Sequence, residues 1–418
     1  MADSAHVSKP LRVLVSEGNS TSSREAITIL GLSGHIVEVC DPGPYCLARF
    51  SRFIDKFHRC PAMRDDPAGF LAFVEELLAT GHFDVLLPIH EQGFLFARVQ
   101  QRLEGRIGLA LPSFPSYRTA HSKAGFSRLL DQLGLPQPAT RIVKSANELR
   151  DAGRFPCVVK TSVGTASRGN WFVRNDSDLD GALQELSAKG AFADDVLVQD
   201  LISGTTEKAQ AVFCRGKLIG FHAFRQIAAG AGGGEAIKQS VSRLNVRTLL
   251  ATIGEKLAWH GALSVDYVVP DDSATPLLID CNPRLVEPMS AYLAGVDLLG
   301  LLLQVSQGET PAAVSESRVG VRTHLAMQAL LGCASRGGTR RDIIRECWRL
   351  KTGGRPYADS AEELTPVRLD WISVVPLAMI AILLLLAPKL GVTLARDGWG
   401  SHLLDLGSIR LIESEDFR

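Results

Sequence analysis

The chain of 418 residues exceeds the roughly 250–300 residues at which one hydrophobic core stops growing, so we expect two or three domains. Its 45 basic and 45 acidic residues give a formal net charge of zero, which excludes the basic surface of a typical nucleic-acid-binding protein and favours small-molecule partners. The eight cysteines show no paired short spacing and no cysteine/histidine cluster, which argues against a zinc site and a disulfide framework. The amino terminus shows no recognisable signal sequence, so we expect a cytoplasmic protein.

The first hundred residues alternate between strand-like and helix-like segments. The pattern predicts strands at 11–16, 35–40 and 84–89 and helices at 23–32 and 68–79. Such alternation is typical of a parallel sheet with crossover helices. The turn after the first strand lacks G-x-G-x-x-G spacing, which excludes dinucleotide binding there. His90 and Glu91 follow the last strand, where open α/β sheets bind ligands, and a purely structural role is the competing interpretation.

A lysine and a small-residue loop follow in the middle of the chain. An apolar strand at 156–160 ends at Lys160 and runs into a loop, 161–170, that is rich in glycine, serine and threonine. Such a loop lets backbone N–H groups approach phosphate oxygens. Taken singly, the loop is equally typical of a hairpin turn and the lysine of a protein surface.

The most informative segment, 263–288, reads as a β-hairpin with acidic residues at mirror-related positions. If the turn is symmetric about Ser273, Asp266 and Asp280 lie directly opposite each other on one face. Two carboxylates roughly 5 Å apart repel each other and weaken the sheet. A solvated hairpin face is the bland alternative.

The alternation of side chains along the second strand extends this face. It places Asn282 and Arg284 on the same side as Asp280. Three oxygen donors beside a guanidinium predict a site for a hard cation and an anion. Cys281 points the other way and reads as a packed thiol.

Residues 280–288, Asp-Cys-Asn-Pro-Arg-Leu-Val-Glu-Pro, resemble the E-x-N-x-R signature of the ATP-grasp superfamily, and the upstream segments follow the order of that family. The resemblance implies an α/β protein with an ATP-grasp fold. The expected parts are a Rossmann-like pre-ATP-grasp domain at 1–115, an ATP-grasp domain at 116–310 with a lid at about 142–198, and a mostly helical carboxyl-terminal extension at 311–418.

The resemblance assigns phosphate and metal contacts to particular residues. It implies that ATP and Mg²⁺ (or Mn²⁺) are bound, with Asp266, Asp280 and Asn282 as metal ligands. Aspartate stands at both positions where glutamate is common, and its shorter arm still reaches magnesium at about 2.1 Å. Arg284 matches the arginine that faces the substrate and the transferred phosphate, and Lys160 matches the lysine on the α-phosphate. The phosphate-covering loop would use Gly164, Thr165 and Ser167.

The remaining nucleotide contacts follow from the same resemblance. Lys123 matches a second nucleotide-facing lysine, although the aspartate usual before it is Ser122. The adenine and ribose contacts would come from the strand at 196–202 and the segment after it: the side chain of Gln199, the backbone of Asp200 and Ile202, and the carboxylate of Glu207.

The function implied is an ATP-dependent ligase that activates a carboxylate as an acyl phosphate for attack by an amine or another nucleophile, releasing ADP and phosphate. Lys160 and Arg284 would be its catalytic residues. The partners would be a small-molecule carboxylate and an amine, whose identities no motif names. A small-molecule kinase and a non-catalytic ATP-binding module remain open as alternatives.

Two further segments carry expectations. The glycine-rich run at 228–235, including Gly232 and Gly233, is expected to form with Arg225 a loop that orders over the substrate. In the carboxyl-terminal part, helices are expected at 318–331 and 339–350. The uncharged run 371–388 reaches the lower length limit of a transmembrane helix, but its internal proline also suits a buried helix of a third domain. Membrane association through this run therefore stays open.

Overall fold

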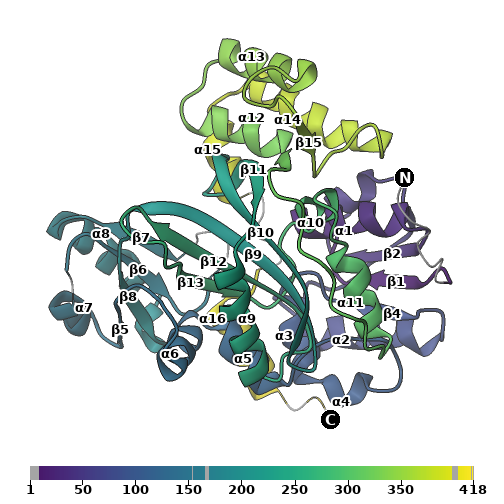
Figure 1. Ribbon diagram of the computed structural model, residues 1–418, viewed down its shortest axis with the longest axis horizontal. Helices are drawn as coiled ribbons and strands as arrows, with labels where there is room; N and C mark the ends of the chain where they lie inside the picture. The colour runs from purple at the N-terminus through teal and green to yellow at the C-terminus, as the bar shows by residue number, and fades with distance from the viewer. Residues whose placement is uncertain (1–8, 153, 165–168, 398–402, 416, 418) are drawn as a thin grey trace.

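The computed structural model describes residues 9–152, 154–164, 169–397, 403–415 and 417. Its amino-terminal part is a parallel four-stranded sheet in the order β3-β2-β1-β4, with helices packed on it (Figure 1). The strands are β1 (Arg12–Val15), β2 (Ile36–Asp41), β3 (Ile54–Arg59) and β4 (Val85–Leu87). The predicted parallel sheet is confirmed. The sequence pattern missed β3, because this edge strand is half-exposed and carries charged residues on both faces.

The helices of this part surround the sheet and connect it to the next one. Helix α1 begins at an N-cap, Ser20, whose side chain accepts a hydrogen bond from Ser23 N. The helices are α1 (Thr21–Leu32), η1 (Leu47–Phe50), α2 (Pro67–Ala79), α3 (Gln92–Arg98), α4 (Gln100–Leu103), α5 (Phe114–His121) and α6 (Lys123–Leu133).

A second four-stranded sheet, in the order β5-β8-β6-β7, forms a separate lobe. We call it the lid lobe because it spans the region of the expected lid, and its movement as a lid stays a prediction. Its strands pair antiparallel throughout and pack against helices through a small core of their own. The elements are β5 (Thr140–Val143), α7 (Ala146–Ala152), β6 (Cys157–Thr161), β7 (Asn170–Val173), α8 (Asp176–Ala188), η2 (Ala191–Ala193) and β8 (Val196–Asp200).

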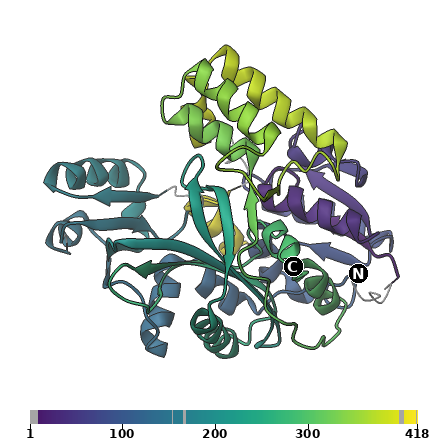
Figure 2. The ribbon, with the colours of Figure 1, turned by 45° about the horizontal axis from the view of Figure 1, so that its top comes forward.

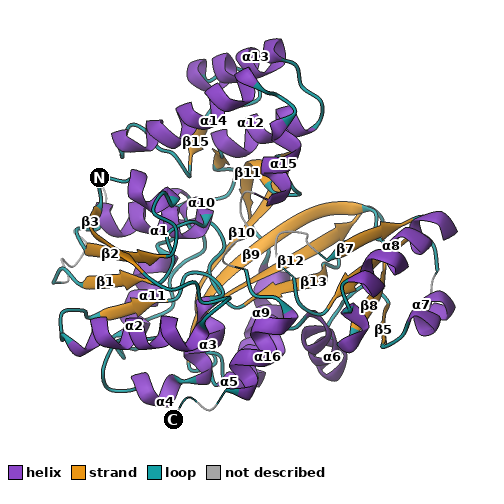
Figure 3. Ribbon diagram, turned by 180° about the vertical axis from the view of Figure 1, so that it is seen from behind, coloured by secondary structure: helices purple, strands orange, loops and turns teal. Residues whose placement is uncertain are grey.

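The largest sheet lies between the lid lobe and the amino-terminal sheet, and its long strands curve across the molecule (Figure 3). Its order is β13-β12-β9-β10-β11-β14-β15. The strands are β9 (Gly204–Cys214), β10 (Lys217–Ala229), β11 (Glu235–Val241), β12 (Gly261–Pro270), β13 (Leu277–Asn282), β14 (Arg322–His324) and β15 (Ser360–Glu362). Helices α9 (Leu244–Lys256), α10 (Met289–Leu293) and α11 (Leu298–Ser306) flank it.

The carboxyl-terminal part differs from the expected helical extension in one respect, because β14 and β15 complete the largest sheet. The predicted helix at 318–331 is wrong in its first half, which forms β14 against β11, and α12 begins only at Ala326. The helix predicted at 339–350 is present. The helices are α12 (Ala326–Ser335), α13 (Arg340–Thr352), η3 (Trp371–Ser373), α14 (Val374–Leu386), α15 (Leu390–Asp397) and α16 (Leu406–Ser414).

The uncharged run 371–388 folds into η3 and α14, and within the described residues no helix is both long and apolar enough to cross a bilayer. One side of α14 packs on α12 and α13, burying Leu384 completely. The other side is exposed, with Met379 at 58% and Leu386 at 70% of their accessible surface. The expected packed helix is therefore present, but only half of it is covered.

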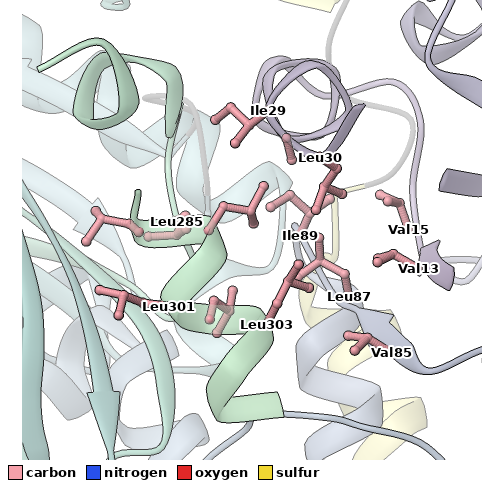
Figure 4. Packing of buried hydrophobic residues seen from close by; sticks show 14 of the residues in the cluster. Val13, Val15, Ile29, Leu30, Val85, Leu87, Ile89, Leu285, Leu301 and Leu303 are labelled. Atoms are coloured by element: carbon pink, nitrogen blue, oxygen red, sulfur yellow. The ribbon is translucent and has the colours of Figure 1, made fainter. Parts of the chain in front are cut away.

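The main hydrophobic core joins the amino-terminal sheet to the hairpin motif. Val13, Val15 and Leu87 from the parallel sheet pack with residues of α11 and with Leu285, as Figure 4 shows. Leu285 directly follows Arg284 in sequence and is almost completely buried. This packing anchors the loop after β13, and so it fixes where the preceding arginine lies.

Candidate functional site

The two acidic residues of the hairpin face each other as the sequence predicts. Asp266 on β12 pairs directly with Asp280 on β13. The register shifts immediately afterwards, where Tyr267 pairs with Leu278, so a bulge compensates for a turn that is not symmetric about Ser273. Burial raises the pKa of Asp266 to about 6; Lys208 opposes this shift and Asp280 adds to it.

Two lysines from different elements converge on this acidic pair. Lys123, the first residue of α6, places Nζ 3.3 Å from a carboxylate oxygen of Asp280. Lys160, at the end of β6, donates to Ile279 O at 3.0 Å, which brings it to the same strand. Burial lowers the pKa of Lys160 to about 8, and Asp280 partly offsets that shift. Charges of both signs are thus gathered at the junction of the lid and the largest sheet.

Local contacts explain how the sequence positions Lys123. Ser122 is the N-cap of α6, and its hydroxyl accepts a hydrogen bond from Gly125 N. The same hydroxyl lies 2.8 Å from that of Ser162, and Lys123 N donates to Ser162 O at 2.8 Å. The serine that stands where the family usually has aspartate therefore caps the helix and ties it to the predicted phosphate loop.

Arg284 lies in a tightly held loop between the largest sheet and α1. Ser264 donates to Arg284 O at 2.7 Å, and Glu287 N donates to Ser22 Oγ at 3.1 Å. The guanidinium itself approaches Ser22 Oγ at 3.4 Å. Burial lowers the pKa of Arg284, with Glu91 acting in the opposite direction. A buried cation held by backbone contacts is preorganised to receive an anion.

A small pocket connects Arg284 to Gly164 of the predicted nucleotide loop, and we call it the Arg284 pocket. It is lined by His90, Glu91, Tyr117, His121, Lys123, Gly164, Cys281, Asn282, Pro283 and Arg284. His90 and Glu91, noted after the strand at 84–89, thus reach the site from the amino-terminal sheet. The hydroxyl of Tyr117 is buried there without a hydrogen-bond partner among the described residues.

A buried ionic cluster supports the Arg284 loop from behind. Carboxylate oxygens of Glu25, Glu287 and Glu363 lie within 4.8 Å of one another. Lys238 on β11 donates to Glu287 and, at 2.7 Å, to Glu363. The ammonium of Lys238 already supplies the positive charge between these carboxylates, so we interpret the cluster as a structural contact rather than a metal site. It connects the amino-terminal part, the largest sheet and the carboxyl-terminal part.

The predicted adenine contacts are only partly available. Gln199 is buried and accepts a hydrogen bond from Lys160 Nζ at 2.7 Å, so its side chain positions that lysine in this structure. The backbone N–H of Asp200 donates to Ala139 O at 3.0 Å and is not free to pair with a base. The expected contact through Ile202, which is half-buried beyond β8, stays a prediction.

The predicted ribose contact of Glu207 is wrong. Both carboxylate oxygens are bound by Arg243, at 2.6 and 2.7 Å, and Tyr267 donates to one of them at 2.9 Å. The side chain is buried beneath the sheet. The sequence placed this acid near the linker, but side-chain alternation turns it away from the cleft.

The glycine-rich segment is also not where the sequence analysis placed it. It forms the turn between β10 and β11, with positive φ angles of 59° at Gly232 and 84° at Gly233. Ala231 N donates to Gln328 Oε1 on α12 at 3.1 Å, so the turn is docked on the carboxyl-terminal helices. Arg225 is exposed and bonds to Gln239. Thr165 and Ser167 of the predicted phosphate loop lie outside the described residues.

Sequence reasoning missed Lys208 and its neighbours. Lys208 pairs with Asp266 across β9 and β12 and forms an ion pair with Glu235 at 2.8 Å. Lys238 was missed in the same way. Each is a lysine inside an otherwise largely uncharged strand, and that unusual placement was the available signal.

The chemistry of the donor set fits a divalent cation and a polyphosphate. The paired carboxylates and the nearby amide of Asn282 are hard oxygen donors, and all three residues are half-buried. Lys123, Lys160 and Arg284 supply positive charge around them. An anionic ligand brought to the metal would therefore be neutralised from several sides.

Comparison with known proteins shows similarity to one family in the central part of the chain. Residues 120–288 match the ATP-grasp domain family. The carbamoyl phosphate synthase large chain of Pyrococcus furiosus is 28% identical over 211 residues, which are 47% of this chain and 19% of that one. The chain therefore spans only about a fifth of the length of this curated relative.

Solved structures share the fold over more of the chain. The biotin carboxylase domain of Hydrogenobacter thermophilus 2-oxoglutarate carboxylase, a complex with MgADP, ADP and bicarbonate, has a TM-score of 0.59 at 15% identity and covers 75% of this chain and 74% of its own. N5-carboxyaminoimidazole synthetase of Staphylococcus aureus, a complex with ADP, has a TM-score of 0.59 at 12% identity, with coverages of 76% and 83%. The TM-scores show a common fold, and at such low identities they show the fold alone.

Proposed function

Because the chain contains an ATP-grasp domain at residues 120–288, we propose that it is an ATP- and Mg²⁺-dependent ligase that activates a carboxylate as an acyl phosphate. An amine or another nucleophile would then attack the acyl group, with release of ADP and phosphate. The single observation that carries this proposal is that Lys123, which contacts Asp280 of the opposed pair, also lines the pocket of the buried Arg284. The proposed cation site therefore adjoins the proposed anion site.

Each residue has a proposed role. Asp266, Asp280 and Asn282 would hold Mg²⁺, which supplies positive charge against phosphate oxygens when bound. Lys123 and Lys160 would hold the phosphate chain from the α6 and β6 sides. These roles rest on the donor chemistry and on the convergence of four separate elements, β12, β13, α6 and β6.

Arg284 would act on the second substrate. A carboxylate resists attack because its leaving group would be an oxide, and phosphorylation makes that oxygen a good leaving group. The guanidinium would neutralise the acyl phosphate and the oxyanion that forms when the nucleophile attacks. The Arg284 pocket opens toward His90 and Glu91 of the amino-terminal sheet, so we place the carboxylate and the nucleophile between the two sheets.

The proposal is tested by product analysis with ATP, Mg²⁺ and panels of small carboxylates and amines. We expect ADP and inorganic phosphate in equal amounts, with turnover that requires both organic substrates. AMP and pyrophosphate would contradict the assignment. A stable phosphorylated product without phosphate release would favour a kinase, and nucleotide binding without turnover on any panel would favour a binding module.

Arg284→Lys provides the matched variant for this assay. Lysine keeps the positive charge but loses the planar fork that binds two oxygens at once. We expect nucleotide binding to be retained and turnover to fall at least roughly tenfold, the loss expected for about 1.4 kcal/mol of transition-state stabilisation. Unchanged turnover would remove Arg284 from the proposed reaction.

A further inference from the structure

Helix α14 presents an apolar stripe to solvent. Its most exposed side chains are Met379 at 58%, Ile382 at 57% and Leu386 at 70% of their accessible surface. Together with Trp371 and Val375, also exposed, they recur every three or four residues and so share one face. An uncovered apolar face of this kind usually marks an interaction site.

The surroundings of this stripe are basic, although the whole chain carries no net charge. Residues 336–389 contain nine lysines and arginines, and all nine are exposed. The same segment contains six acidic residues, of which Asp342 and Glu346 pair with Arg345 and Arg349. Nine basic and six acidic residues leave this segment with a net excess of three positive charges.

Basic side chains stand at both ends of the stripe. Arg368 precedes Trp371 by three residues, and Lys389 follows Leu386 by three. Arg340 of α13 reaches the carboxyl end of α14, where it donates to Leu386 O at 2.9 Å. The apolar face is thus framed by cations on flexible stems.

We propose that this face, made of the α14 stripe and its basic frame, docks on the surface of an anionic lipid bilayer. A helix of 13 residues is about 20 Å long, so α14 lies in the interface plane with its stripe among the upper acyl chains. The basic frame meets the phosphate groups of anionic lipids. Exposed Trp371 adds an amphipathic ring that favours a membrane interface.

Charge decides between a bilayer and a second copy of the chain. In a symmetric dimer the same face meets itself, which would bring the two basic frames together and cost binding energy. An anionic bilayer instead attracts the basic frame of a single copy and also receives its apolar stripe. Figures 1 and 2 show that α12, α13 and α14 project together from one end of the molecule, where a flat surface can reach them.

The test is co-sedimentation of the full chain with lipid vesicles. We expect binding to vesicles of phosphatidylcholine and phosphatidylglycerol in equal parts, weak binding to pure phosphatidylcholine, and a decline with added salt. Met379→Ser combined with Ile382→Ser should abolish sedimentation. The matched control is Leu244→Ser on α9. It removes an aliphatic side chain of similar exposure, 62%, that lies outside the proposed face, so this variant should bind as the wild type does.

Variants that remove basic residues distinguish electrostatic docking on anionic lipid from non-specific hydrophobic adsorption. Arg368→Gln with Lys389→Gln should weaken the partition coefficient for anionic vesicles about 25-fold, or about fivefold for each basic residue removed. Circular dichroism and thermal unfolding confirm that each variant is folded. Equal sedimentation of wild type and the Met379/Ile382 variant would overturn the proposal. So would a wild-type dimer in solution that the serine variant converts to monomers, since a second copy would then cover the face.

Discussion

Replacing Asp266 by asparagine tests the opposed acids directly. The pKa of Asp266 in the folded protein is about 6, against an ordinary value of 3.8, so the folded state binds this proton more tightly than the unfolded state does. A raised pKa contributes stability below the unfolded value, and that stability is lost as pH rises through about 6. The shift corresponds to roughly 3 kcal/mol, which we reduce to about 2 kcal/mol because the side chain is half-exposed.

Asp266→Asn should therefore unfold less readily than the wild type above neutral pH without metal, by about 2 kcal/mol, and should match it near pH 4. Lys208 keeps its ion pair with Glu235, so the substitution leaves no buried cation without a partner. Asp280→Asn is a less clean variant, because it breaks the ion pair with Lys123.

The same variant should lose the response to ligand. Wild-type protein should gain about 2.7 kcal/mol from Mg²⁺ and ATP at a hundredfold excess over the dissociation constant, and Asp266→Asn should gain much less. Denaturant unfolding across pH, with and without Mg²⁺ and ATP, measures both effects. Asp272→Asn, an exposed acid in the turn of the same hairpin, is the control. If the Asp266 and Asp272 variants behave alike, the cost of the buried Asp266 carboxylate beside Asp280 and the metal site are both refuted.

Three further substitutions test other parts of the site. Nucleotide binding by the wild type should weaken as pH rises through about 8, where Lys160 loses its proton. The Lys160→Arg variant should keep the same nucleotide affinity across this range in a calorimetric titration. If the affinities of both proteins change with pH in the same way, Lys160 makes no phosphate contact. Glu207→Gln should lower the free energy of unfolding by about 2 kcal/mol, because it weakens charged hydrogen bonds to the partly exposed Arg243. Nucleotide binding by the folded protein should not weaken, and the reverse result would restore the ribose contact. Asp370→Asn should lower the free energy of unfolding by about 3 kcal/mol, because it breaks the buried ion pair with Arg24 of α1. It should also make the carboxyl-terminal helices accessible to limited proteolysis. Unchanged unfolding and cleavage would show that this ion pair does not hold those helices in place.

Local patterns determined much of the site. The opposition of Asp266 and Asp280 followed from strand alternation and hairpin pairing, because both depend only on neighbouring residues. The order of Lys123, Lys160 and the Arg284 motif along the chain likewise pointed to one family. Such features are readable because each is encoded within one or two adjacent elements.

Other features depended on contacts between segments far apart in sequence. Glu207 carries the same charge whether it faces the cleft or the core, and only its neighbours Arg243 and Tyr267 show that it is structural. The glycine-rich turn is flexible in composition, yet it is held by α12, which lies about a hundred residues later. Conformational freedom in a sequence is not mobility in the fold, since a partner can remove it.

The resemblance of the 280–288 motif to one family indicated the fold class, whereas periodicity and spacing indicated the hairpin with its opposed acids and the chemistry that those acids support, because both act locally. Tertiary structure decided which face of β9 meets the site, how Glu25, Lys238 and Glu363 join three parts of the chain, and which half of α14 stays uncovered. Each of these depends on what packs against an element, and burial is a property of the whole assembly of elements rather than of any one segment.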